Sequence, residues 1–242
     1  MNTNDITQKL RRALYVKNCG AVIVAAGTAS RMGGIDKVMA QLGAEPMVLR
    51  TVRAFQACDV IRSIVIVTRQ DLVEAVGQLC AGMDKVCAVV IGGKDRPSSV
   101  EAGLKALPKD TKLVAVHDGA RPMITMEIID RTVRAAHSYG AAAPAIPVKD
   151  TIKVAKGGVV DTTPDRSKLR AVQTPQVFDL DLLKGALKKA REDNAEITDD
   201  CSAVERLGMS VKLVEGDERN IKVTTPVDLK IAQLFLEEMQ CG

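Results

Sequence analysis

Short, continuous apolar runs alternate with amphipathic stretches through the first half of the chain. Runs of this kind are typical of strands that are buried on both faces of a sheet. They predict strands over 21–26, 63–68, 86–91, 113–116 and 141–146. The stretches between them predict helices over 46–57, 70–80, 98–107 and 126–139. This alternation predicts an α/β fold: a three-layer, Rossmann-like, mostly parallel sheet with helices on both faces.

Residues 148–169 interrupt this alternation. The segment is polar, and Gly157-Gly158 separates its two alternating halves, which predicts a projecting β-hairpin arm. Because the arm holds little apolar material, it needs a surface to dock on. We expect residues 1–242 to form a single domain in which 148–169 is a dimerisation arm. Beyond the arm we expect a helix over 181–192, a short capped helix from Thr198, a strand near 211–214 and a last helix from Thr225.

Composition narrows the class of protein. The 242 residues are 46% hydrophobic and 26% charged, as in a globular protein with a full core. No apolar run approaches the roughly 18 residues of a membrane span, and no secretory signal is evident, so we expect a cytoplasmic protein that does not bind membranes. The net charge of +4 and the 2% aromatic content argue against nucleic-acid binding. The six cysteines are scattered without a CxxC pair, which favours reduced thiols and no zinc site.

The loop after the first predicted strand, Ala25 to Lys37, reads AAGTASRMGGIDK. Small residues after a buried strand allow backbone N–H groups to approach a phosphate, and Arg31 and Lys37 add cations. The loop contains neither Gly-Lys-Ser/Thr nor GxGxxG, so it is neither a P-loop nor a dinucleotide-binding loop. Taken alone, it is equally compatible with a simple glycine turn that carries solvated cations.

Two more loops follow predicted strands, at the sheet edge where ligands bind in such folds. Gly92-Gly93 precedes Ser98-Ser99, and Asp118 and Arg121 follow the strand over 113–116. Each loop also has a purely structural interpretation. The first is a glycine turn into a helix capped by Ser, and the second is a turn before Pro122.

Several motifs together identify a resemblance. The first loop is similar to AAGxGxRMxxxxPK of the sugar-phosphate nucleotidyltransferases, with Ala29 and Asp36 as departures and one residue fewer. More narrowly, the chain from Ala21 onward resembles the 2-C-methyl-D-erythritol 4-phosphate cytidylyltransferase family. The motifs that carry this resemblance are HDGARP (117–122), PVKDTIK (147–153), TPQ (174–176), ITDD (197–200), VEG (214–216) and NIKVT (220–224).

The resemblance implies an enzyme of non-mevalonate isoprenoid biosynthesis. It would join CTP to the polyol phosphate 2-C-methyl-D-erythritol 4-phosphate, releasing CDP-methylerythritol and pyrophosphate. It would use Mg²⁺ or another divalent cation, held mainly by substrate phosphates and not by metal-ligating side chains. It would be a homodimer in which Thr151 and Arg166 of the arm reach the partner's site.

By the same resemblance, residues of this chain take three kinds of role. Those expected to be catalytic are Arg31, Lys37, Arg166 and Lys222. Those expected to bind the nucleotide are Ala25, Ala26, Gly27, Gly92, Gly93, Ser99 and Gly119. Those expected to bind the acceptor are Asp118, Arg121, Thr151 and Thr198. We expect Asp199 and Asp200 to cap a helix, and His117 to be structural.

Two alternatives stay open. Ribitol-5-phosphate cytidylyltransferases share several of these motifs, although PVKDTIK and the segment from Thr198 favour the methylerythritol family. The other alternative is a nucleotide-binding sensor that has lost catalysis, and only the departures at Ala29 and Asp36 support it.

Overall fold

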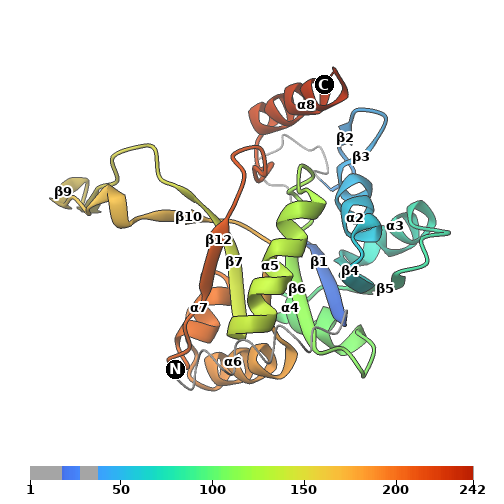
Figure 1. Cartoon of the computed structure of the whole chain (residues 1–242), viewed down its shortest axis with the longest axis horizontal. Helices are drawn as coiled ribbons and strands as arrows, with labels where there is room; N and C mark the ends of the chain where they lie inside the picture. The colour runs from blue at the N-terminus through green and yellow to red at the C-terminus, as the bar shows by residue number, and fades with distance from the viewer. Residues whose placement is uncertain (1–17, 28–37, 242) are drawn as a thin grey trace.

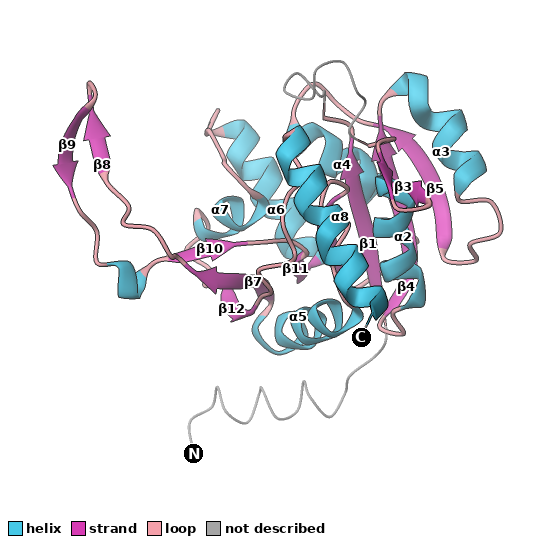
Figure 2. Cartoon of the chain, turned by 90° about the horizontal axis from the view of Figure 1, so that it is seen from above, coloured by secondary structure: helices cyan, strands magenta, loops and turns pink. Residues whose placement is uncertain are grey.

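A mixed β-sheet forms the centre of the molecule (Figures 1 and 2) in a computed structural model that describes residues 18–27 and 38–241. In this part of the chain the sheet has eight strands, in the order β10-β7-β11-β6-β1-β4-β5, with β12 also paired to β7. These strands are β1 (Cys19–Ala25), β4 (Ile61–Thr68), β5 (Val86–Ile91), β6 (Leu113–Asp118), β7 (Ala141–Pro147), β10 (Arg170–Val172), β11 (Gln176–Asp179) and β12 (Lys212–Glu215). Among them, only β10 and β11 run antiparallel to their neighbours.

Helices cover both faces of the sheet. One face packs against α2 (Met47–Ala57), α3 (Val73–Leu79) and α5 (Met126–Tyr139), and the other against α4 (Arg96–Ala106), α6 (Leu180–Glu192) and α7 (Asp200–Glu205). The alternation along β1 shows why. Ala21 and Ile23 belong to the first core cluster and Val22 to the second, and all three are fully buried. The predicted three-layer architecture is confirmed.

The C-terminal helix α8 (Pro226–Cys241) belongs to a third, smaller core cluster. Its Ala232 and Leu236 pack with Leu42 and Met47, near the two-stranded sheet of β2 (Gln41–Leu42) and β3 (Glu45–Pro46). Val223, in the segment that leads into α8, is fully buried in the same cluster. The C-terminal helix therefore fastens this segment to the rest of the domain. None of the described helices combines the length and apolar character needed to cross a membrane.

The predicted arm is present as a separate two-stranded sheet of β8 (Val154–Lys156) and β9 (Val159–Thr162), followed by a 3₁₀ turn (Arg166–Lys168). It projects away from the body of the molecule (Figures 1 and 2). Gly157 and Gly158 have φ angles of 59° and 81°, the left-handed backbone of a two-residue type I′ hairpin turn. Val159 is 71% and Val160 55% exposed. The arm therefore carries apolar surface that its own chain does not cover.

Several boundaries differ from the sequence predictions. Helix α4 begins at Arg96, two residues earlier than expected, because the Asp95 side chain accepts a hydrogen bond from the Ser98 backbone N–H at 2.8 Å. The predicted helix over 70–80 is divided into a 3₁₀ turn (Gln70–Leu72) and α3. Strands β10 and β11 were not predicted. They follow one another along the same edge of β7, and the TPQ motif lies at the break between them.

Candidate active site

A cleft of about 400 Å³ opens where β1, β5 and β6 end. Its lining includes Ala25–Gly27 after β1, Gly93–Arg96 after β5, Asp118 and Ala120 around the end of β6, and Lys222 from the segment before α8. The carboxyl ends of parallel strands meet at one edge of a sheet, which is why these distant segments converge. The sequence predicted this edge as the place for chemistry, and the cleft lies there.

Small residues allow the loops after β1, β5 and β6 to approach one another closely. A Cβ on Gly92 would lie 2.4 Å from the Cβ of Ala26, and a Cβ on Gly119 would lie 3.0 Å from the Cβ of Ala25. Ser99, only 3% exposed, accepts from the Gly93 N–H at 3.1 Å and donates to a backbone carbonyl at 2.9 Å. The Ser99 hydroxyl therefore shapes the glycine turn, and its expected contact with the nucleotide stays a prediction.

Asp118 is the acidic centre of the site. Its side chain is 8% exposed and pairs with three cations: Arg96, Lys222 with Nζ 2.9 Å from Oδ2, and Arg121 with Nε 3.7 Å from Oδ2. Burial opposes ionisation of this carboxyl, but Arg96 and Lys222 outweigh burial and hold its pKa below the usual range. Asp118 is therefore an anion that gathers three positive side chains at the cleft.

Arg96 links Asp118 to a second buried carboxylate. Its Nη2 lies 2.8 Å from Oδ2 of Asp200, which is 1% exposed. Burial raises the pKa of Asp200, although Arg96 counteracts this effect. Asp200 lies in the first turn of α7, as expected for an acid at the N-terminal end of a helix, but its side chain also pairs with Arg96, which was not predicted. Asp199 does cap α7, in a capping box with Ser202.

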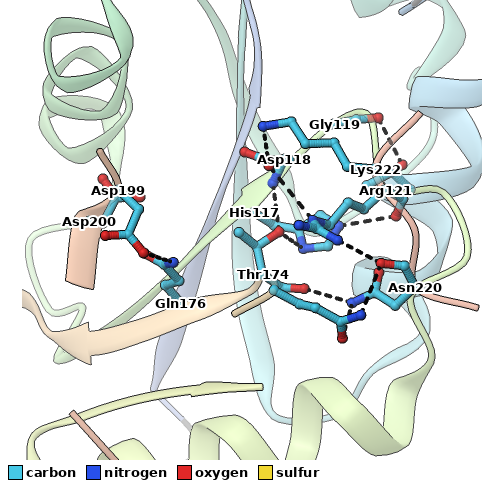
Figure 3. A network of polar contacts seen from close by, with 12 residues as sticks. His117, Asp118, Gly119, Arg121, Thr174, Gln176, Asp199, Asp200, Asn220 and Lys222 are labelled. Atoms are coloured by element: carbon cyan, nitrogen blue, oxygen red, sulfur yellow. Dashed lines mark hydrogen bonds and ion pairs between the residues drawn. The ribbon is translucent and has the colours of Figure 1, made fainter. Parts of the chain in front are cut away.

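His117 and three polar neighbours lie beneath this cluster (Figure 3). His117 is fully buried, with Nδ1 3.0 Å from the Thr174 hydroxyl and Nε2 3.2 Å from the Arg121 carbonyl. Burial lowers the pKa of His117 to about 3, so the ring is neutral and unsuited to proton transfer with a substrate near pH 7. Asn220, also fully buried, donates to the Thr174 carbonyl at 3.0 Å.

Other predicted residues lie away from the cleft. Thr151 and Arg166 are exposed on the projecting arm, where Arg166 donates to the Lys149 carbonyl at 2.8 Å. Thr198 is exposed one residue before the cap of α7. Arg31 and Lys37, and the departures at Ala29 and Asp36, lie outside the described residues. In the described part of the chain, Lys222 and Asp118 line the cleft and Arg121 lies beside Asp118, whereas Thr151, Arg166 and Thr198 do not line it.

Sequence reasoning assigned no role to Arg96, Thr174 or Asn220, and it expected Asp200 only to cap a helix. Asp200, Thr174 and Asn220 lie within recognised motifs, but only the fold places these residues and Arg96 around Asp118. One signal was available for Arg96. It follows Gly92-Gly93 after a strand that was predicted to end at the same sheet edge as Asp118.

The fold and the cleft together define a nucleotidyltransferase. A Rossmann-like sheet carries small-residue loops at its carboxyl edge, beside cations that can hold two anionic reactants. Residues 19–238 match the family described as IspD: 2-C-methyl-D-erythritol 4-phosphate cytidylyltransferase. The chain belongs to this family.

Individual relatives agree with the family match. A 2-C-methyl-D-erythritol 4-phosphate cytidylyltransferase of Caldanaerobacter subterraneus subsp. tengcongensis is 44% identical over 91% of this chain and 100% of its own length. A protein of the same description from Symbiobacterium thermophilum is 46% identical over 90% of this chain and 92% of its own. The crystal structure of a 4-diphosphocytidyl-2C-methyl-D-erythritol synthase from Anaerococcus prevotii has a TM-score of 0.83 at 30% identity, covering 91% of this chain and 98% of that one. Of the two cytidylyltransferase families that the sequence left open, these comparisons support the methylerythritol family.

Proposed function

We propose that this chain transfers the cytidylyl group of CTP to the phosphate of 2-C-methyl-D-erythritol 4-phosphate, in non-mevalonate isoprenoid biosynthesis. The products are CDP-methylerythritol and pyrophosphate. The observation that carries this proposal is the convergence of Asp118 and Lys222 on one cleft with the glycine loops after β1 and β5, with Arg121 paired to Asp118, in a member of this family. We also propose that the reaction takes place in the cytoplasm.

The acceptor phosphate supplies the nucleophile. One of its oxygens attacks the α-phosphorus of CTP, and the bond from that phosphorus to the departing pyrophosphate breaks. The phosphate is already anionic near neutral pH, so no general base or covalent enzyme intermediate is needed. Bringing two anions together is the main task, which cationic side chains perform by binding, positioning and stabilising charge.

The chain's cations divide this work between the two reactants. Lys222 and Arg121 bind the acceptor phosphate, while Asp118 accepts hydrogen bonds from the acceptor hydroxyls. Arg31 and Lys37 neutralise charge on the triphosphate. The cost of losing Lys222 would be felt in the chemical step, because charge builds on the phosphates as the bond to pyrophosphate breaks.

A divalent cation would be held mainly by the substrate phosphates. The described residues contain no group of three or more His, Cys, Asp or Glu side chains that could hold a metal ion. Three cations offset the charge of Asp118 and Asp95 caps α4, so neither carboxylate offers a metal ion an uncompensated negative charge. This donor set fits Mg²⁺ that arrives with CTP. When bound, the ion supplies further charge neutralisation on the phosphates.

We also propose that the chain is a single nucleotidyltransferase domain whose residues 148–169 form a dimerisation arm. The exposed Val154, Val159 and Val160 on a projecting hairpin support this assignment, because such surface is costly unless a partner covers it. In the dimer, Thr151 and Arg166 of one protomer complete the acceptor site of the other, which accounts for their distance from the cleft of their own chain.

A pyrophosphate-release assay tests the proposed function. The four nucleoside triphosphates are each combined with 2-C-methyl-D-erythritol 4-phosphate and with ribitol 5-phosphate. We expect release with CTP and the methylerythritol acceptor. Faster turnover with ribitol 5-phosphate would identify the chain as a ribitol-5-phosphate cytidylyltransferase. CTP binding without release from any pair would instead identify a nucleotide sensor.

A further inference from the structure

Hydrogen-bond chemistry fixes the tautomer of His117. The Asp118 backbone N–H can only donate, and its partner at 3.1 Å is the Thr174 hydroxyl oxygen. The Arg121 carbonyl, 3.2 Å from Nε2 of His117, can only accept, so Nε2 of the neutral ring carries the hydrogen and donates it to that carbonyl. Nδ1 is then the acceptor. The Thr174 hydroxyl donates to Nδ1, 3.0 Å away, while it accepts from the Asp118 N–H.

These contacts close into a ring (Figure 3). From Arg121 the chain of bonds continues, because its Nη1 donates to the Asn220 carbonyl at 2.7 Å. The Asn220 side-chain amide donates to the Thr174 carbonyl at 3.0 Å, which returns to the start. The side chains of His117, Thr174 and Asn220 belong to residues that are 0%, 4% and 0% exposed. Because these side chains are buried, water has little access to the bonds that they make.

The ring joins the segments that carry the acceptor-binding side chains. His117 precedes Asp118 on β6, Arg121 is itself a member, and Asn220 lies two residues before Lys222. The backbone N–H of Asp118 is tied to the same ring through Thr174. The relative positions of Asp118, Arg121 and Lys222 therefore depend on these bonds.

We propose that His117 is a positioning residue, whose Nε2–H tautomer fastens the Arg121 loop and the Asn220–Lys222 segment to the end of β6. The acceptor-binding cluster is thereby preformed before the substrates arrive. This inference rests on the proposed function, because it assigns the cluster to the acceptor. Small displacements in such a site are expensive, since a misplacement of about 1 Å can cost about 10²-fold in rate.

A purely structural role for His117 predicts something different. The imidazole also packs against Phe55, with ring centroids 4.9 Å apart, so its loss could simply weaken the fold. A weakened fold lowers the amount of active enzyme and reduces the apparent kcat, but it leaves the KM for each substrate unchanged. Loss of positioning raises the KM for the acceptor and spares the KM for CTP.

Two substitutions separate the two sides of the imidazole. In His117→Gln the amide reaches the former position of Nε2, so it can still donate to the Arg121 carbonyl. In His117→Asn the shorter amide reaches only toward Thr174, and the bond to Arg121 is lost. We expect His117→Asn to raise the acceptor KM about tenfold, the loss of one buried hydrogen bond, with His117→Gln closer to wild type. The KM for CTP should stay within about threefold in both variants.

The same kinetic measurements can overturn the positioning role of His117. In His117→Asn, an acceptor KM and a kcat per folded enzyme that both match wild type leave His117 with a structural role alone. If His117→Asn does not fold, Thr174→Val serves in its place, because it keeps the shape of the side chain and removes the hydroxyl. An unchanged acceptor KM and an unchanged kcat per folded enzyme in that variant overturn the proposal in the same way.

The tautomer can be observed directly by ¹⁵N NMR of the imidazole nitrogens at pH 7. The chain has two histidines, and a His137→Gln variant assigns the signals of His117. We expect an unprotonated Nδ1 and a protonated Nε2. An Nδ1–H tautomer or an imidazolium would disprove the ring even in a fully active enzyme. A wild type that releases no pyrophosphate would overturn the proposed function and leave the tautomer result standing.

Discussion

We predict that lowering the pH from 7 to 5 removes about 2 kcal/mol from the free energy of unfolding through His117 alone. In the folded protein, burial lowers the pKa of this side chain to about 3. In the unfolded chain the pKa returns to about 6.5. Between these values the unfolded state binds a proton that the folded state does not bind, so stability falls as the pH falls.

The magnitude follows from that difference in proton binding. Well below pH 6.5 the free energy of unfolding falls by about 1.4 kcal/mol for each pH unit, and this loss starts gradually near the unfolded pKa. From pH 7 to pH 5 the integrated loss is about 2 kcal/mol, and it continues until the pH approaches the folded value. Asp200, whose pKa is raised by burial, makes the free energy of unfolding rise as the pH falls. Asp118, whose pKa is lowered, makes the free energy of unfolding fall with pH, but only below its unfolded pKa.

Urea unfolding at pH 7 and pH 5 provides the assay, with wild type and His117→Asn compared at both values. Contributions from Asp200 and Asp118 are present in both proteins and largely cancel in the comparison. Wild type should lose about 2 kcal/mol more than His117→Asn on acidification. A His137→Gln control should retain the wild-type His117 contribution. Equal acid sensitivity of wild type and His117→Asn would refute the reasoning, because it would mean that His117 takes up a proton in the folded state.

Further predictions concern the cleft and the arm. Lys222→Ala and Lys37→Ala should each lower turnover about 10²-fold in the pyrophosphate assay, and unchanged turnover would contradict their roles. Lys188→Ala, on the exposed side of α6, is the matched control. Gly92→Ala places a Cβ against the loop after β1 and should raise the KM for CTP about tenfold; an unaltered KM would show that this loop contact is dispensable. Val160→Asp should yield monomers in analytical ultracentrifugation with low turnover, and a stable, active dimer would argue against the arm assignment. Chelation with EDTA should abolish turnover and added Mg²⁺ restore it, whereas activity in EDTA would exclude the proposed metal requirement.

The sequence predicted the central strands, the helices on both faces and the arm. These features depend on local patterns, such as the apolar run of β1 and the paired glycines of the hairpin turn. The edge of the sheet that carries the site was predictable for a related reason. Loops after parallel strands converge whatever their sequences are, so Asp118 could be placed beside Gly92 before any contact was known.

The interior of the site was not predictable in this way. Asp200 has the sequence signature of a helix cap, and nothing local indicates that it pairs with Arg96, 104 residues away. Strands β10 and β11 were overlooked because each is short and residues 173–175 separate them. The contacts of Thr174 with His117 depend on that break in the edge of the sheet. Pairings of this kind are set by tertiary packing, which overrides local propensity.

The attachment of α8 has a consequence for the order in which the enzyme matures during synthesis. Lys222 is set in place by Val223 and by the packing of Ala232 and Leu236 against Leu42 and Met47, which are made far earlier on the ribosome. The packing that anchors Lys222 is therefore complete only after α8 has been synthesised and docked on these earlier residues. A premature stop just after residue 225 would remove that packing and leave Lys222 unanchored at the cleft.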